Sequence, residues 1–314
     1  MNRQLLVAGL LCLPTAAWSL EFEFGEEFFV SLDSTVTYAA AWRVEDRDER
    51  RSGRGFLAAL QEDPFLPLTQ PEYTVEQTGL INANDGNNNF DKGWISNRVT
   101  YVLEMDARWR DYGLFVRGRA FYDTVYKDGS TDLENIDYAT YNSGLLYGGA
   151  ARPGEFPPGT RDEHGSVLEF LDVFAYATWI IPGDRLLDLR VGRQVINWGE
   201  STFYQGINSI QNRADARTAN VPGVEVKEIL LPTGAIYGQV DLLPNLTFEA
   251  YYQYEWLENY LNGVGSYFSY TDQVGPGAVS FLTPSPGLPI VPEDIRGNEF
   301  HLRGVPRLGD EEAS

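Results

Sequence analysis

Strict alternation of apolar and polar side chains is the feature that most constrains the fold of this chain. It is clearest in residues 186–201, LLDLRVGRQVINWGES, where Leu187, Leu189 and Val191 fall on one face of an extended chain and polar side chains fall on the other. A period of two with one apolar face predicts a half-buried β-strand. Whether the apolar face contacts a protein core or lipid decides the fold class.

The same alternation recurs along the chain and predicts about seven strands. They occupy residues 30–44, 97–109, 114–126, 167–181, 186–201, 235–242 and 246–256. Short turns and long polar segments alternate between them, as in outer-membrane β-barrels with short periplasmic turns and long outer loops. Several segments hold about 11 to 15 residues, enough to cross a bilayer at a tilt, whereas strands of a β-sandwich usually hold about 5 or 6.

Tryptophans lie at or beside the ends of the predicted strands. On the long-loop side these are Trp42, Trp94, Trp198 and Trp256, and on the short-turn side they are Trp109 and Trp179. Because tryptophan is enriched where a membrane meets water, the two groups predict two aromatic girdles. We therefore predict an all-β fold, an antiparallel transmembrane β-barrel of the outer-membrane type. The alternative is a secreted acidic β-sandwich, whose apolar faces would pack on each other.

The N-terminus has the pattern of a secretory signal peptide. Arg3 precedes an apolar run over residues 5–13, and a small-x-small cleavage site ends at Ser19. We predict a signal peptide over residues 1–19 and a barrel in the cell outer membrane over residues 20–314. The only cysteine, Cys12, lies in the signal, so we expect a mature chain without disulfides or thiol chemistry.

Charge and strand number add two further predictions. The chain has 45 acidic and 24 basic residues and a net charge of −21, which argues against nucleic acid as a partner. Closed bacterial barrels have an even number of strands, whereas about seven are predicted for this chain. We therefore expect the sequence to be the N-terminal portion of a longer barrel, unless another chain supplies the missing wall.

Five blocks of sequence, in order, resemble a family of Gram-negative outer-membrane proteins known as domain of unknown function 1302. They are NDGNNNFDKG (84–93), YGLFVRGRAFYD (112–123), LRVGRQVINWGES (189–201), NLTFEAYYQYEW (245–256) and GSYFSYTDQVGPGA (265–278). The resemblance implies an outer-membrane β-barrel and longer family members. It implies no reaction, substrate or catalytic residue.

Charged side chains on the polar faces of the predicted strands should line the lumen, because a charge at the lipid midplane costs about 2 to 4 kcal/mol. They are Arg98, Glu104, Asp106, Arg108, Arg117, Arg119, Asp188, Arg190, Glu249 and Glu255. One interpretation is a lattice of cross-strand ion pairs that supports the wall, and the other is a charged pore lining that selects solutes.

Aromatic side chains share the predicted lumen with these charges. They are Phe115, Phe121, Phe174, Tyr176 and Tyr251. A conduit for a hydrophobic or amphipathic small molecule needs such apolar contact surface. Packing against an inserted loop explains these aromatics equally well.

Residues 200–232 form an insert that is too long for a turn. Its apolar positions are Phe203, Ile207, Ile210, Val221, Val224 and Ile229. An external loop has no reason to be so apolar unless it packs on something. We therefore predict that the insert folds into the lumen.

Residue types suited to catalysis or metal binding are sparse. The two histidines, His164 and His301, are predicted in loops without a companion at ligand spacing, so we predict no catalytic residue, metal or cofactor. The oxygen-rich segment 82–91 raises the alternative of a Ca²⁺ site. It lacks the EF-hand spacing, which favours a Gly/Asn turn.

These patterns predict an outer-membrane channel or transporter. Its partners would be outer-membrane lipid and a small-molecule cargo of unknown identity, preferably hydrophobic or amphipathic. The alternative is a plugged barrel that scaffolds periplasmic or other envelope proteins. An outer-membrane hydrolase is the third and least favoured hypothesis.

Overall fold

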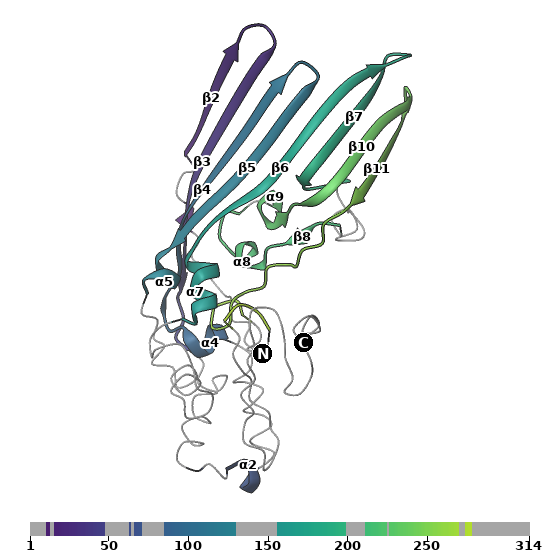
Figure 1. Ribbon diagram of the computed structural model, residues 1–314. Helices are drawn as coiled ribbons and strands as arrows, with labels where there is room; N and C mark the ends of the chain where they lie inside the picture. The colour runs from purple at the N-terminus through teal and green to yellow at the C-terminus, as the bar shows by residue number, and fades with distance from the viewer. Residues whose placement is uncertain are drawn as a thin grey trace, which may run out of the picture.

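The computed structural model describes residues 11–12, 16–47, 63, 66–70, 85–129, 156–198, 211–224, 226–269 and 274–277. An antiparallel sheet of nine strands dominates this part of the chain (Figure 1). The strands are β1 (Leu11–Cys12), β2 (Ala16–Phe24), β3 (Phe28–Arg43), β4 (Gly93–Trp109), β5 (Tyr112–Asp123), β6 (Ser166–Ile181), β7 (Arg185–Gln194), β10 (Thr233–Leu243) and β11 (Leu246–Gln253). Their order in the sheet is β1-β3-β4-β5-β6-β7-β10-β11, and β2 also pairs with β3. The predicted all-β class is confirmed.

Smaller elements lie in the connections. A second sheet pairs β8 (Arg213–Ala214) with β9 (Leu230–Leu231). The helices are α2 (Leu66–Thr69), α4 (Asp85–Asn89), α5 (Thr124–Lys127), α7 (Pro158–Gly165), α8 (Ala216–Ala219) and α9 (Val226–Ile229). In the described ranges, no helix has the length and apolar character needed to cross a membrane.

Successive strands form hairpins whose tight turns lie at one end of the sheet (Figure 1). These turns join β2 to β3, β4 to β5, β6 to β7 and β10 to β11. Gly25 and Gly183 provide positive φ angles of +71° and +94° in two of them, which a residue without Cβ adopts at little cost. The long connections leave the opposite end, where the helices lie.

Strand boundaries differ from the prediction in a few places. The sequence interpretation began the wall at residue 30, but β2 precedes it and pairs with β3 from Ala16↔Val36 to Phe24↔Phe28. The sequence does not predict this strand because residues 16–19 fall in the predicted signal peptide, which leaves a short alternating segment before Gly25. Pairing with β3 extends the strand back to Ala16. The segment predicted over 114–126 stops at Asp123, whose side chain accepts a hydrogen bond from Val125 N and caps α5.

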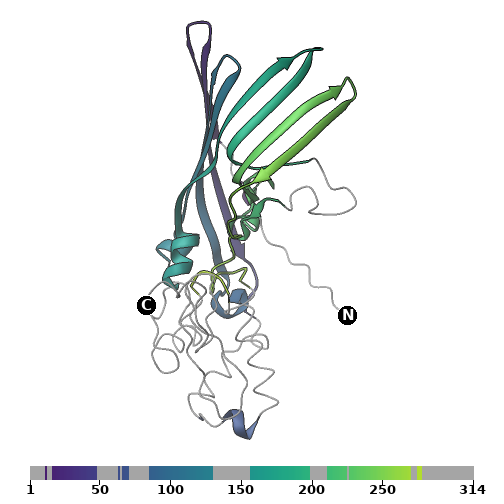
Figure 2. The ribbon, with the colours of Figure 1, turned by 45° about the vertical axis from the view of Figure 1, so that its right-hand side comes forward.

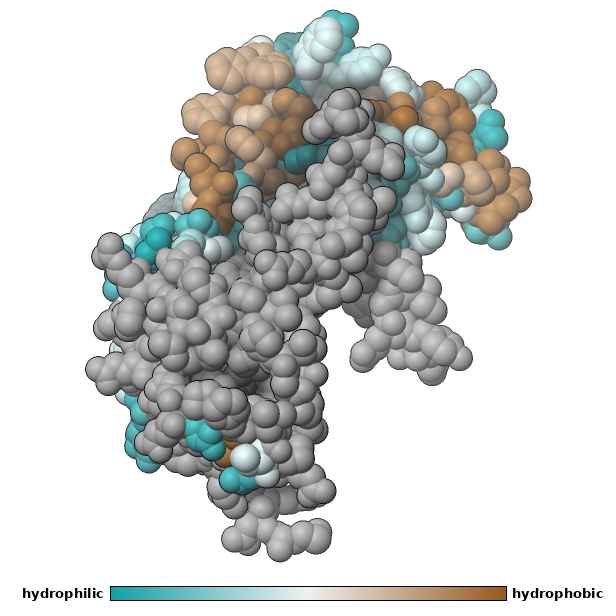
Figure 3. Space-filling model, turned by 60° about the horizontal axis from the view of Figure 1, so that its bottom comes forward, coloured by the Kyte–Doolittle hydropathy of each residue, from teal (hydrophilic) through white to brown (hydrophobic). Residues whose placement is uncertain are grey.

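The main sheet has two chemically distinct faces. On β4, Val99, Tyr101 and Leu103 are exposed, whereas Arg98, which lies on the opposite side of the sheet, is 3% exposed. We call the side with the exposed residues the apolar face and the side with Arg98 the charged face. Figure 3 shows hydrophobic side chains gathered over the strands. The alternation in the sequence therefore predicts the two faces of β4 correctly.

A β-bulge shifts the facing of the side chains within residues 167–181. The register between β5 and β6 jumps from Val116↔Val173 to Gly118↔Phe170, so two residues of β6, Leu171 and Asp172, lie opposite Arg117. A bulge shifts the side-chain alternation by one residue. Before the bulge Phe170 is 74% exposed, and after it the exposed position moves to Val173.

The sheet is curved (Figure 2) but does not close within the described residues. β11 forms one edge, and β1 and β2 lie at the other. At the long-loop end the chain packs into a small core of Phe90, Ile95, Tyr126, Phe156 and Val264. These residues come from segments far apart in the sequence, so the long-loop end is tied together by tertiary packing.

Candidate functional site

The charged face brings together most of the residues predicted to line a lumen. In the β4–β5 register Glu104 lies opposite Arg117, and in the β7–β10 register Arg190 lies opposite Tyr237. Glu255 differs, because it follows the end of β11 and pairs with Arg193 at 2.5 Å. Arg193 has the same parity on β7 as the exposed Val191. Glu255 therefore lies apart from the other charges.

Ion pairs compensate several of these charges. Arg108 pairs with Asp106 at 2.5 Å, and the hydroxyl of Tyr176 also donates a hydrogen bond to Asp106 at 2.5 Å. Arg117 pairs at 2.5 Å with Asp172, and both side chains are buried. Asp172 is the residue that the bulge of β6 turns toward the charged face. In the sequence pattern Asp172 shares a face with Phe174 and Tyr176, but it is not among the residues predicted to line the lumen.

The centre of the site is Asp215, a side chain with no exposed surface. It accepts hydrogen bonds from Arg119 on β5 at 2.6 Å, from Arg217 Nε at 2.8 Å and from Thr218 Oγ1 at 2.9 Å. It also accepts from the backbone N–H of Arg217 at 3.0 Å, which caps α8. Burial alone would raise the pKa of Asp215, but the hydrogen bonds and charges of Arg217 and Arg119 outweigh it and hold this pKa below its ordinary value.

Arg217 extends the network to the wall and to α7. It pairs with Glu163 of α7 and approaches Glu169 of β6 at 3.5 Å. Its guanidinium carbon lies 3.6 Å from the centre of the Tyr260 ring. Burial would lower the pKa of Arg217, but the hydrogen bond and charge of Asp215 raise it, so this arginine is permanently charged.

These contacts attach the insert to the charged face of the sheet. Arg119 on β5 pairs with Glu169 at 2.5 Å and with Asp215 at 2.6 Å, and so joins β6 and the insert. Of the apolar positions that motivated the prediction, Val221, Val224 and Ile229 are half-buried. Phe203, Ile207 and Ile210 lie outside the described residues. Ion pairs of charged side chains hold the insert on the sheet. Two of these residues, Asp215 and Arg217, are not among those predicted from the sequence.

His164 corrects a prediction. It lies at the end of α7 and is buried, whereas the sequence interpretation placed it in a loop. Its Nε2 accepts a hydrogen bond from the backbone N–H of Gly263 at 2.8 Å. Burial, reinforced by the charge of Arg217, lowers the pKa of His164 to about 3. The ring is therefore neutral and serves as a structural acceptor, while His301 lies outside the described residues.

Aromatic rings and Arg190 form a row across the charged face. Phe115 and Phe174 have centroids 5.3 Å apart, and the guanidinium of Arg190 lies 5.8 Å from Phe174 and 5.4 Å from Tyr237. Tyr251 lies opposite Tyr237 in the sheet. Phe121 is separate, since it is buried beneath Arg98 with the guanidinium 3.4 Å from the ring centre.

The tryptophans lie near the strand ends, but not all on one face. Trp42 and Trp94 pair edge to face at 4.7 Å at the long-loop end. At the short-turn end, Tyr112 lies within 6.4 Å of Trp109 and 6.0 Å of Trp179. Trp256, beyond β11, is largely exposed. Trp198 packs on Tyr251 at 5.3 Å, which places it with the aromatic row of the charged face.

The asparagine-rich segment surrounds an arginine. Arg43 donates hydrogen bonds to the carbonyl oxygens of Gly86 and Phe90 at 2.7 Å each, and to Asn87 Oδ1 at 2.8 Å. A guanidinium thus occupies three of the oxygen atoms that this segment could offer to a Ca²⁺ ion. Among the described residues there is no group of three or more His, Cys, Asp and Glu side chains that could hold a metal ion.

Comparison with known proteins gives one match. A family model described as protein of unknown function (DUF1302) covers residues 1–314, the whole chain. The chain belongs to this family. Neither the comparison with curated proteins nor the comparison with solved structures gives a match. The resemblance inferred from the five sequence blocks is therefore confirmed, and DUF1302 membership assigns no activity to the charged face.

Proposed function

We propose that this DUF1302 protein is an outer-membrane β-barrel channel or transporter for a hydrophobic or amphipathic small molecule, exported by a signal peptide over residues 1–19. Cleavage after Ser19 would remove β1 and residues 16–19 of β2, and residues 20–24 of β2 would remain at the edge of the sheet. One observation carries the proposal. The sheet exposes an apolar face, and on the opposite face an insert is held by the buried Arg119–Asp215 pair at 2.6 Å. A wall that is apolar outside and charged inside, with a loop fixed on the inside, is the architecture of a constricted pore.

Exposure of the apolar face supports the membrane location. Leu168 and Phe170 are 87% and 74% exposed, and β3 and β4 are 16 and 17 residues long. Large apolar patches on a water-soluble protein normally mark a contact surface, and lipid is a contact that extends over a whole sheet. Closure into a barrel would complete the backbone hydrogen bonds at both edges, as a bilayer requires.

The aromatic row supports the class of cargo. Its rings present flat apolar surfaces across neighbouring strands, from Phe115 on β5 to Tyr251 on β11. Such rings bind apolar bodies without demanding a fixed hydrogen-bond pattern.

A second candidate function is favoured by the burial of the ion-pair network. Asp215 is fully buried, and Arg119 is 1% exposed, so separating them would leave charges without partners. A permanently closed lumen would suit a structural barrel that scaffolds envelope proteins. The two candidates differ in whether anything passes through the protein.

Transport into vesicles tests the proposal. The protein is reconstituted in vesicles, and uptake of a fluorescent fatty-acyl probe is compared with uptake of a sugar of similar size. We expect faster probe uptake than in empty vesicles, and we expect Tyr251→Ala to reduce it about fivefold through loss of aromatic contact worth about 1 kcal/mol. A correctly inserted protein that moves neither solute would support the plugged scaffold.

A further inference from the structure

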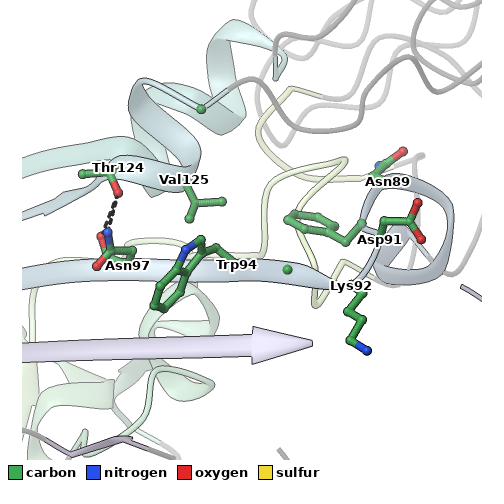
Figure 4. Close-up of a pocket in the computed structure, with 10 residues that line it drawn as sticks. Asn89, Asp91, Lys92, Trp94, Asn97, Thr124 and Val125 are labelled. Carbon is green, nitrogen blue, oxygen red and sulfur yellow. Dashed lines mark hydrogen bonds between the residues drawn. The ribbon is translucent and has the colours of Figure 1, made fainter. Parts of the chain in front are cut away.

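A cavity of about 300 Å³ opens at the long-loop end of β4. Its lining comes from the start of β4, from the segment that precedes it and from α5. Figure 4 shows Trp94 between Asn97 and Lys92, with Val125 above the indole. Aromatic, amide, hydroxyl and ammonium groups thus border one open space.

The cavity lies at the end of the apolar face. Asn97 has the same parity on β4 as Val99, Tyr101 and Leu103, which are all exposed. Ile95 has no register partner on β3, so the alternation shifts by one residue there. On the N-terminal side of Ile95, Trp94 pairs with Trp42. A ligand whose head fills the cavity could therefore extend an apolar tail along the exposed side chains of β4.

Hydrogen bonds hold the polar part of the cavity in place. Asn97 Oδ1 accepts from the Tyr38 hydroxyl at 2.8 Å, and Asn97 Nδ2 donates to Thr124 Oγ1 at 2.8 Å. This fixes the amide and the hydroxyl at the mouth without the help of a ligand. The site is therefore preorganised, which reduces the ordering cost of binding.

Lys92 supplies a positive charge without a protein partner. It is exposed and makes no ion pair within the part of the chain that the structure describes. Its neighbour Asp91 is already paired with Arg47 at 3.5 Å. A phosphate is a ligand that an ammonium group and neighbouring hydrogen-bond donors recognise together.

The geometry points to a binding site for the head of a phosphorylated lipid at the outer surface of the membrane. This inference rests on the proposed membrane location and adds a ligand outside the lumen. Lys92 binds the phosphate, Trp94 lies at headgroup level, and the acyl chains run along Val99, Tyr101 and Leu103. A free phosphate ion would use only Lys92, so the lipid is the favoured source.

Lipid titration followed by native mass spectrometry tests the site. The full-length protein, in detergent, is titrated with lipid A, with dephosphorylated lipid A and, in a separate arm, with inorganic phosphate. We expect lipid A to bind most tightly and Lys92→Gln to weaken it about fivefold, the effect of about 1 kcal/mol per lysine near a membrane surface. Trp94→Phe should weaken both lipids by similar factors.

Two matched variants control for general effects. Lys127→Gln removes a lysine from α5 that does not line the cavity, and Trp109→Phe removes a tryptophan of similar exposure at the other end of β4. Both should bind lipid A as the wild type does. Equal affinity of Lys92→Gln and wild type, or phosphate binding as tight as lipid A binding, would overturn the inference. Neither result would affect the transport assay, whereas a protein that fails to insert into vesicles would refute the proposed function itself.

Discussion

Asp215 is a carboxylate without exposed surface that is held by two arginines. Removing its charge in Asp215→Asn leaves Arg119 and Arg217 buried with fewer counter-charges. Breaking a buried pair from one side costs about 3 to 5 kcal/mol, so we expect a loss of at least about 3 kcal/mol in the free energy of unfolding. Urea titration of the vesicle-inserted protein, followed by tryptophan fluorescence, measures it.

Asp33 provides the control for this substitution. It is an exposed carboxylate on β3 that accepts a long hydrogen bond of 3.4 Å from Ser31. Asp33→Asn should change the free energy of unfolding by less than about 0.5 kcal/mol, as is usual for exposed positions. Equal effects of the two substitutions would show that the buried network contributes no special stability.

His164 makes stability depend on pH. Its pKa is lowered to about 3 in the folded protein from 6.5 in an unfolded chain, so the unfolded state binds a proton first as the pH falls. The stabilisation is therefore complete above about pH 6.5 and is lost progressively toward the folded-state pKa, by about 1.4 kcal/mol per pH unit. Unfolding titrations between pH 7 and pH 5 measure this slope.

A matched variant isolates the histidine. His164→Gln keeps a hydrogen-bond acceptor for the backbone N–H of Gly263 but does not titrate in this range. We expect its free energy of unfolding to vary less steeply with pH than that of the wild type. An unchanged slope would mean that other groups cause the dependence.

At the scale of elements, β6 and β7 approach closely beside the bulge. Gly192 has φ +137°, and a Cβ placed there would lie 2.3 Å from the carbonyl oxygen of Val173. Gly192→Ala must therefore shift the strand, and we expect a loss of about 2 kcal/mol or more from backbone strain and steric conflict. Thermal unfolding of the reconstituted protein measures it.

Gly238 on β10 is the matched control, because a Cβ there would lie 3.9 Å from the nearest atom, the carbonyl oxygen of Asp188. Gly238→Ala should leave the unfolding temperature close to that of the wild type. If both alanines were tolerated equally, the close approach of β6 to β7 would be disproved.

The periodicity of the sequence predicts these strands because each side chain meets one of two environments. It does not predict the bulge, because an extra residue changes the facing without changing the composition of the segment. β7 ends at Gln194, although the predicted strand covers residues 186–201. Beyond Gln194 the chain turns away, since Ile196 hydrogen-bonds to Asn212 of the insert. A local sequence pattern does not predict a strand end that such a tertiary contact determines.

For the whole molecule, the proposed membrane location predicts opposite environments for adjacent residues. The mature chain would hold no cysteine, because Cys12 is the only one, so single cysteines can be introduced at Leu103 and Glu104. We expect Leu103→Cys to be protected from a charged aqueous thiol reagent, because it lies on the apolar face. Glu104→Cys should show the reverse. Equal reactivity of both cysteines in vesicles would contradict a membrane-spanning wall.

The sequence alone predicts β3 to β7, β10 and β11 and most of their facing, because alternation with a period of two records which side of a sheet each residue occupies. It does not predict β2 or the bulge of β6. It also predicts family membership. Only the tertiary structure reveals that Asp172 faces Arg117, that Asp215 joins the insert to β5, that Arg43 fills the asparagine-rich turn and that His164 is buried. Each of these contacts links residues far apart in the chain or depends on a bulge, so the fold brings together groups that no local pattern relates.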